Sequence, residues 1–162
     1  MRRNTNQNKY LNALLFFMKY CNNYYLGATK LNKLLYYLDF ISYRDRKQSV
    51  TGDDYLHKAY GPVPDSVDDF IAMLKKDGKI KVETISLKDG EKKDYNPLCS
   101  PDVSVFDSYE KELLDKICKE FLLWPTEKMV AQTHLEAPWF YSKPYDVVDY
   151  DYANDIEFFL PQ

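Results

Sequence analysis

The two histidines of the chain, His57 and His134, are the residues best suited to catalysis or metal binding. Neither lies in a spacing that zinc sites use, such as H-E-x-x-H, or H-x-E followed by P-C-x-x-C. A catalytic triad is a spatial arrangement and could assemble around either histidine. No motif indicates one, so we expect His134 to bond to the backbone at a helix end. A hydrolase that uses His134 and Glu136 is a competing hypothesis of another class.

The sequence indicates neither thiol chemistry nor phosphate binding. Cys21, Cys99 and Cys118 are odd in number and far apart, with no C-x-x-C pair, which argues against a disulfide framework and a zinc site. The glycines are isolated from one another, so no glycine-rich loop can hold a phosphate group. We therefore expect no catalysis, no metal and no cofactor, and a reducing cytoplasm as the compartment.

Length and composition set the frame for the fold. The 162 residues are 45% hydrophobic, and 22 basic against 25 acidic side chains give a net charge of −3. Residues 1–162 are expected to form one acidic domain that removes roughly 70% of its unfolded surface from water. No apolar run approaches the roughly 20 residues that cross a bilayer, and the polar stretch Met1 to Asn8 has no signal-peptide pattern. Neither a transmembrane helix nor a signal peptide is expected.

Two amphipathic helices are predicted first. Apolar residues recur at helical spacing over about 9–21 and again from a cap at Thr29 to about residue 41. The short link between them predicts an antiparallel pair. On the second helix we expect Lys30, Lys33 and Asp39 to lie on the solvent side.

Local signals place the remaining elements. Residues 50–60 are expected to form a loop with a short strand, and a third helix, opened by a capping-box-like Ser66 and Asp69, ends at Gly78. Alternation over about 79–98 predicts a β-hairpin that turns at Asp89-Gly90, and the slip in apolar phase between Val82 and Ile85 suggests a β-bulge. A fourth helix is capped by Asp107 with Glu110, and a fifth begins at Pro125 and ends near His134.

A short terminal helix through Ile156, Phe159 and Leu160 completes the predicted elements. The fold class is therefore α+β, a single mostly helical domain of about five to six helices with one β-hairpin.

Tyrosine is unusually frequent, with 15 residues. Tyr36, Tyr37 and Tyr60 are expected in the core, because large aromatic side chains are usually well buried. The acidic, tyrosine-rich segment of about 141–162 has no basic residue after Lys143, and it is the best candidate for docking a basic partner. It could equally be a strap on its own domain. Its candidate contact residues are Tyr145, Asp146, Asp149, Tyr150 and Asp151.

Helices followed by a hairpin are also the order of a winged helix, so DNA binding is the alternative function. A partial basic face is offered by Lys30, Lys33, Arg44, Arg46 and Lys47. Phosphate binding needs several cations that converge. The acids interleaved with the hairpin lysines and the negative net charge make a nucleic-acid partner the less favoured hypothesis.

Three segments together resemble the Panacea, or SocA-like antitoxin, domain. They are K-L-N-K-L-L-Y-Y at 30–37, Y-G-P-V-P-D-S-V at 60–67 and T-H-L-E-A-P-W at 133–139. Their order and spacing match that family, and residues 155–159 resemble its closing helix. The chain departs from the family pattern before the Tyr-Gly-Pro turn, where it has Leu56 and His57, and before the fifth helix, where it has Trp124-Pro125.

The resemblance implies an antitoxin of a bacterial or phage toxin–antitoxin pair, which binds a co-encoded toxin and performs no catalysis. One branch of the family hands its toxin to an AAA+ protease, and members pair with unrelated toxins. The matching residues Tyr60, Gly61, Pro62, His134 and Trp139 have both a binding and a scaffold interpretation. Gly61 permits a backbone geometry that a side chain resists, Pro62 stiffens the turn, and Trp139 would fill a helix corner.

Overall fold

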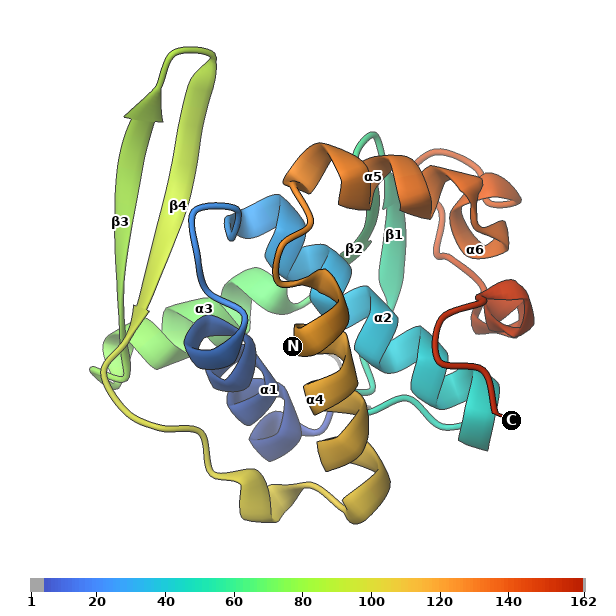
Figure 1. Ribbon diagram of the computed structural model, residues 1–162, viewed down its shortest axis with the longest axis horizontal. Helices are drawn as coiled ribbons and strands as arrows, with labels where there is room; N and C mark the ends of the chain where they lie inside the picture. The colour runs from blue at the N-terminus through green and yellow to red at the C-terminus, as the bar shows by residue number, and fades with distance from the viewer. Residues whose placement is uncertain (1–4, 162) are drawn as a thin grey trace.

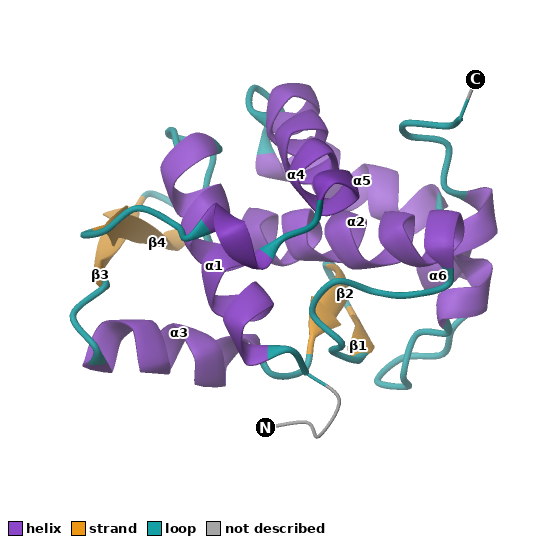
Figure 2. Cartoon of the chain, turned by 90° about the horizontal axis from the view of Figure 1, so that it is seen from below, coloured by secondary structure: helices purple, strands orange, loops and turns teal. Residues whose placement is uncertain are grey.

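Helix α2 (Ala28–Arg46) lies at the centre of the fold, with other elements packed around it (Figures 1 and 2). The computed structural model describes residues 5–161, so the start of the Met1 to Asn8 stretch lies outside the described residues. The remaining elements are α1 (Gln7–Tyr20), β1 (Tyr55–Lys58), β2 (Gly61–Pro64), α3 (Val67–Lys76), β3 (Ile80–Leu87), β4 (Gly90–Pro97), η1 (Val103–Val105), α4 (Ser108–Phe121), α5 (Thr126–Leu135), α6 (Ala137–Phe140) and η2 (Tyr150–Asp155). The predicted α+β class is confirmed.

The central position of α2 overturns the expectation that its polar residues face solvent. Lys30, Lys33 and Asp39 are all completely buried. Helices α1, α4 and α5, strand β2 and turn η2 contact α2, so no side of this helix is left to water along most of its length. A buried charged group is tolerated only where polar partners replace its hydration, and each of these three residues has found such partners.

Lys30 links α2 to the end of α4. Its ammonium group donates hydrogen bonds to the carbonyl oxygens of Phe121, Leu122 and Trp124, at 2.6, 3.1 and 2.9 Å. The last carbonyl groups of a helix have no partner within that helix, and they carry partial negative charge. Lys30 therefore acts as a buried cationic cap where the chain turns from α4 into α5.

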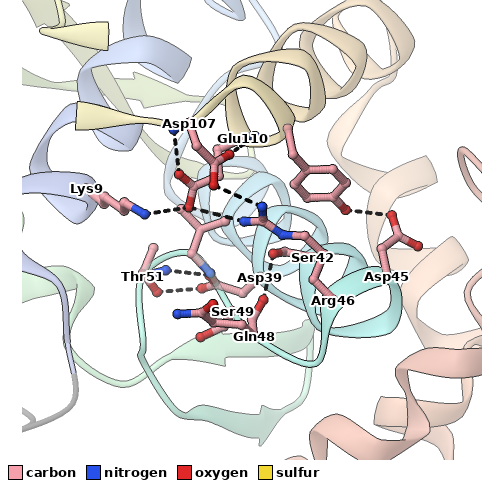
Figure 3. Close-up of polar contacts among 12 residues, drawn as sticks. Lys9, Asp39, Ser42, Asp45, Arg46, Gln48, Ser49, Thr51, Asp107 and Glu110 are labelled. Atoms are coloured by element: carbon pink, nitrogen blue, oxygen red, sulfur yellow. Dashed lines mark hydrogen bonds and ion pairs between the residues drawn. The ribbon is translucent and has the colours of Figure 1, made fainter. Parts of the chain in front are cut away.

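Asp39 holds the loop that follows α2. One carboxylate oxygen accepts from the backbone N–H groups of Val50 and Thr51, at 2.8 and 2.7 Å. The other accepts from the hydroxyl of Thr51 at 2.5 Å (Figure 3) and from the hydroxyl of Tyr55 at 2.6 Å. Burial raises the pKa of Asp39 to about 6, although all four hydrogen bonds oppose the rise. This single side chain therefore fixes the path from α2 into β1.

The helix caps predicted from local sequence patterns are only partly confirmed. The capping box of Asp107 and Glu110 at α4 is confirmed, and Lys9 and Arg46 form ion pairs with it (Figure 3). The cap predicted at Thr29 is wrong, because the N-cap is Gly27, two residues earlier, and α2 begins at Ala28.

At α3, Ser66 occupies the N-cap position but does not form the predicted capping box. Its side chain makes no cap hydrogen bond. The hydroxyl instead donates to Asp53 at 3.2 Å, and the Ser66 N–H donates to the same carboxylate at 2.9 Å. A tertiary partner has therefore replaced the local one, while α3 still ends just before Gly78 as predicted.

Two antiparallel hairpins are present where one was predicted. The β3–β4 hairpin projects away from the helices (Figure 1), and its span agrees with the prediction. The predicted bulge is wrong, because pairing runs without interruption from Ile80 opposite Pro97 to Leu87 opposite Gly90. Most of β3 is exposed on both faces. No core therefore requires its apolar residues to lie on one face, and the slip in their alternation does not produce a bulge. The second hairpin, β1–β2, forms where a loop with a short strand was expected.

The C-terminal segment is also arranged differently from the prediction. No helix runs through Ile156, Phe159 and Leu160; a 3-10 turn, η2, precedes them instead. The guanidinium of Arg44 donates to the carbonyl oxygens of Ile156, Phe158 and Phe159, at 2.8, 2.6 and 3.0 Å. Because a side chain satisfies these carbonyl groups, the segment needs no helix here and turns at Phe158 and Phe159.

Within residues 5–161, no helix combines the length and apolar character that a bilayer crossing requires. The same residues contain no cluster of three His, Cys, Asp or Glu side chains placed to hold a metal ion.

Candidate partner-binding surface

The segments that carry the family resemblance meet in space. Gly61, at the start of β2, lies against Lys33 of α2 and Thr133 of α5. Its φ angle is +111°, as expected for a residue chosen for its lack of a side chain. A Cβ atom at this position would lie 2.5 Å from Lys33 Cε and 2.7 Å from Thr133 Oγ1. Segments 30–37, 60–67 and 133–139 thus form one junction beneath the β1–β2 hairpin.

Lys33 lies at the bottom of this junction. Its ammonium group donates one hydrogen bond, to the carbonyl oxygen of Pro62 at 3.0 Å. No carboxylate forms an ion pair with it among residues 5–161. Burial lowers the pKa of Lys33 to about 7, because the charged amine loses its hydration. Lys33 therefore supports the hairpin from below and is shielded from solvent.

Glu136 closes the other side of the junction. Its carboxylate accepts hydrogen bonds from the hydroxyls of Tyr36 and Tyr37, at 3.0 and 3.1 Å, and from Gln132 Nε2 at 3.1 Å. Burial raises the pKa of Glu136 to about 7. Both tyrosines are completely buried, so their predicted place in the core is confirmed.

This carboxyl group makes a pH dependence measurable. Since its pKa is about 7 in the folded chain against an ordinary 4.5, the folded state holds a proton that the unfolded state has released between those pH values. Stability is therefore lost as pH rises through this window, by about 3 kcal/mol from this group. Urea unfolding between pH 4.5 and 7.5 should show a flatter profile for Glu136→Gln than for the wild type. Equal slopes for the two proteins would contradict this assignment.

Trp139 fills the space between α5 and β1. Its ring stacks on the rings of His134 and His57, with centroid separations of 3.9 and 4.2 Å, and its Nε1 donates to the carbonyl oxygen of Lys58 at 2.8 Å. His134 Nε2 is buried and has no hydrogen-bond partner among the described residues. The predicted backbone bond of His134 is therefore not made through this nitrogen; the ring is held by stacking.

Two of the candidate tyrosines stand out from this support into solvent. Tyr60 is 68% exposed and Tyr145 is 76% exposed, so the expected core position of Tyr60 is wrong. The reason is that Tyr60 falls in the turn between β1 and β2. A hollow of about 410 Å³ separates its ring from Val130 and His134 of α5. Exposed aromatic side chains on a hydrogen-bonded support are typical of protein interfaces.

The tail beyond α6 joins the same surface. Tyr145 N–H donates to His57 O at 2.8 Å, His57 N–H to Asp146 O at 2.9 Å, and Val148 N–H to Tyr55 O at 2.7 Å. Residues 145–148 thus lie antiparallel along β1, with an isolated β-bridge between Leu56 and Val147. The carboxylate of Asp146 is exposed in this segment.

The rest of the tail candidates have contacts of their own. Tyr150 stacks on Phe40 with a centroid separation of 4.2 Å and donates to Asp53 O at 2.7 Å, so its ring helps to cover α2. Asp149 caps η2 by accepting from Asp151 N–H at 2.8 Å, and Asp151 accepts from the hydroxyl of Tyr43 at 3.1 Å. Both carboxylates remain exposed, whereas Tyr150 is half-buried.

Sequence reasoning missed part of the exposed apolar surface. Leu135 and Phe140 are 80% and 63% exposed at the end of α5 and in α6, next to Tyr141, which is 62% exposed and begins the predicted docking segment. The run from Leu135 to Tyr141 is mostly apolar, and no period in it separates buried from exposed positions, because α6 has only four residues. Only the turn between α5 and α6 decides which side chains face solvent.

The basic face that favoured DNA binding is not present as expected. Lys30 and Lys33 are buried, Arg44 is engaged with the tail carbonyl groups, and Arg46 pairs with Asp107. Of the five expected cations, Lys47 alone is exposed without an ion pair among the described residues. One such cation does not form a phosphate footprint.

Comparison with known proteins gives one match. The family model described as Antitoxin SocA-like, Panacea domain, matches residues 31–140, a range that includes nearly all of the three converging segments. Neither the curated proteins nor the solved structures contain a match.

Proposed function

Because the chain belongs to the SocA-like antitoxin, Panacea domain family, we propose that it neutralises a co-encoded toxin by binding it directly. The observation that carries the proposal is the family match over residues 31–140 of 162. The arrangement of the matched residues supports it. Within the matched range, Lys33, Gly61 and Thr133 meet in a buried junction beneath the β1–β2 hairpin, while aromatic and acidic side chains around it are exposed.

The proposed contact surface has two parts. The first is built on the junction and contains Tyr60, His134, Trp139, Tyr145 and Asp146, with Gly61 and Pro62 as support. The second follows the tail through Asp149, Tyr150 and Asp151. Large aromatic rings supply contact area at low entropic cost, and acidic groups speed the approach of a basic partner. No step of this function requires bond making or breaking by the chain.

Co-expression tests the proposal. The gene adjacent to this one is expressed alone and together with it, and growth is measured. We expect arrest with the adjacent gene alone and growth when both are present. A frameshifted copy of this gene should give no rescue, which controls for transcription of the region. Failure of every adjacent gene to be toxic alone and harmless in the pair would overturn the proposal.

Delivery of the toxin to an AAA+ protease is a second part of the proposal. It is tested by the half-life of the toxin after protein synthesis is stopped. Delivery predicts a shorter half-life when this chain is present, and the shortening should disappear in cells that lack the protease. A half-life that does not depend on the chain would limit its function to direct neutralisation.

The tail acids give a prediction on association kinetics. Replacement of Asp146, Asp149 and Asp151 by asparagine keeps hydrogen-bond acceptors for η2 and Tyr43 but removes three charges. We expect the association rate with the toxin to fall about tenfold at low salt, and less at high salt, because long-range attraction is screened. Stopped-flow mixing measures the rate, and thermal unfolding of the variant should change little.

The matched control for this variant neutralises three exposed acids elsewhere, Asp89, Glu112 and Glu120. Its association rate should stay near that of the wild type. A melting temperature lowered in the tail variant with an unchanged association rate would show that the tail is only a structural strap.

A further inference from the structure

A second hollow is lined by residues of α5, α6 and η2. Helices α5 and α6 lie at the same end of the molecule (Figure 1). Its volume is about 480 Å³. It is lined by Gln132, Leu135, Glu136, Ala137, Phe140, Tyr141, Asp155 and Glu157, which we call the acidic hollow. None of the side chains proposed above for the contact surface lines it.

The acidic hollow has an apolar, aromatic wall that nothing within residues 5–161 covers. Leu135, Phe140 and Tyr141 are more than 60% exposed, and the rings of Phe140 and Tyr141 meet with centroids 5.2 Å apart. The ring of Tyr152 continues this wall, 5.5 Å from that of Tyr141. Adjacent exposed apolar side chains mark interaction sites more often than single ones do. The wall therefore favours a partner that contributes apolar area.

The charge of the acidic hollow has one sign. Three of its eight lining residues are acids, and none is a lysine or an arginine. Asp155 and Glu157 are exposed and form no ion pair within residues 5–161. Other acids of the fold are compensated by a cation, among them Glu110 by Lys9 at 2.8 Å and Asp107 by Arg46 at 2.9 Å. A cationic partner would complement this uncompensated charge.

We propose that the acidic hollow binds an arginine-bearing apolar segment of the toxin. That the partner is the toxin rests on the proposed function. An arginine is the side chain that the lining fits. Its planar guanidinium stacks on aromatic rings such as Phe140 and Tyr141, and it donates paired hydrogen bonds to carboxylates such as Asp155 and Glu157. Apolar neighbours of the arginine would pack on Leu135.

The acidic hollow is already in place before a partner arrives. Glu136 at its base is fixed by hydrogen bonds from Tyr36, Tyr37 and Gln132. The tail that carries Glu157 is tied to α2 by Arg44, which bonds to the carbonyl groups on either side of it, those of Ile156 and Phe158. Preformed sites lose less conformational entropy on binding. A short segment is therefore sufficient as a probe.

The test uses two blocked octapeptides and the full chain labelled with 15N. One peptide is acetyl-Gly-Leu-Phe-Arg-Leu-Leu-Arg-Gly-amide, and the other has citrulline, which is uncharged, at both arginine positions. Titration followed by amide NMR shifts should map the arginine peptide to residues 132–141 and 155–157. The citrulline peptide should bind about tenfold more weakly, because it cannot form charge-assisted hydrogen bonds.

Two double variants test whether Asp155 and Glu157 bind the arginine side chains of the peptide. The double variant Asp155→Asn with Glu157→Gln should weaken binding of the arginine peptide about tenfold and remove the difference between the two peptides. The control, Asp89→Asn with Glu120→Gln, changes the same charge at exposed positions on the β3–β4 turn and on α4, and should leave both affinities unchanged. Shifts outside the acidic hollow, no binding of the arginine peptide, or equal affinities of the two peptides would each overturn the inference.

This result and that of the co-expression test can be told apart. If no adjacent gene is neutralised, the proposed function fails whatever the peptides do. If the wild-type chain rescues growth but binds both peptides equally, the inference about the acidic hollow fails alone.

Discussion

Replacement of Gly61 by alanine is expected to lower the free energy of unfolding by about 4 kcal/mol, the sum of backbone strain and overpacking. The strain arises because φ at this position is +111°, which L residues other than glycine rarely adopt. The overpacking arises because the new Cβ would lie 2.5 Å from Lys33 Cε and 2.7 Å from Thr133 Oγ1. Lys33 is completely buried and donates to the carbonyl oxygen of Pro62, so a movement of its side chain would disturb that hydrogen bond. Thermal unfolding should show a midpoint lowered by roughly 10 °C.

Gly90 supplies the matched control for this change. Its φ angle is +140°, but no atom lies within 4 Å of the position that a Cβ would take. Gly90→Ala therefore carries the backbone strain without the overpacking, and should cost about 1–2 kcal/mol. If both variants lose the same stability, the close contact of Gly61 with Lys33 and Thr133 is not what requires a glycine there.

Replacement of Asp39 by alanine is expected to cost about 4 kcal/mol, because it leaves several buried donors without an acceptor. The backbone N–H groups of Val50 and Thr51 are the most affected, since they cannot turn toward another partner. Chemical denaturation with urea measures the loss. The rigid path from α2 into the β1–β2 hairpin should loosen with it, visible as faster amide hydrogen exchange in residues 50–55.

Asp39→Asn distinguishes lost hydrogen bonds from lost charge. The asparagine oxygen can still accept from the two backbone N–H groups, and the hydroxyls of Thr51 and Tyr55 can rotate to accept from its amide. We therefore expect a loss well below that of alanine. The stability that wild type loses between pH 3.8 and about 6, as the folded carboxyl is forced to ionise, should be absent from this variant. An asparagine variant as unstable as the alanine one would show that the negative charge itself is required.

Sequence patterns predicted the elements whose signals are local. The capping box at Asp107 and Glu110 satisfies its own helix end, so the start of α4 could be read directly. The β3–β4 hairpin is joined by a tight turn and makes few contacts with the rest of the fold, so its span was also predictable. The bulge was not, because apolar alternation reports register only where one face of a strand is buried.

Long-range partners explain the predictions that failed. Lys30, Lys33 and Asp39 fit the polar side of an amphipathic helix, and only their partners, up to about 90 residues away in sequence, make their burial tolerable. Ser66 bonds to Asp53 and not to its own helix. Arg44 takes the carbonyl groups that a terminal helix would have paired. No periodicity within a single segment carries this information.

The candidate surface was predictable in part. The family segments identified the junction around Gly61, and the acidic composition of the tail identified Asp146, Asp149 and Asp151. Which side chains are exposed depended on the turn between α5 and α6, so Leu135 and Phe140 could not be found from sequence. Tyr150 has the composition of a contact residue, but its ring packs on Phe40.

We propose that this chain acts by binding a toxin and makes no covalent change in it. The most direct measurement is mass spectrometry of the toxin recovered from a purified complex, combined with an assay of its activity after separation in denaturant and refolding. We expect a stable complex, a toxin of unchanged mass and full recovery of toxicity. A toxin that is modified or cleaved by the purified chain, or that forms no complex with it, would contradict the account.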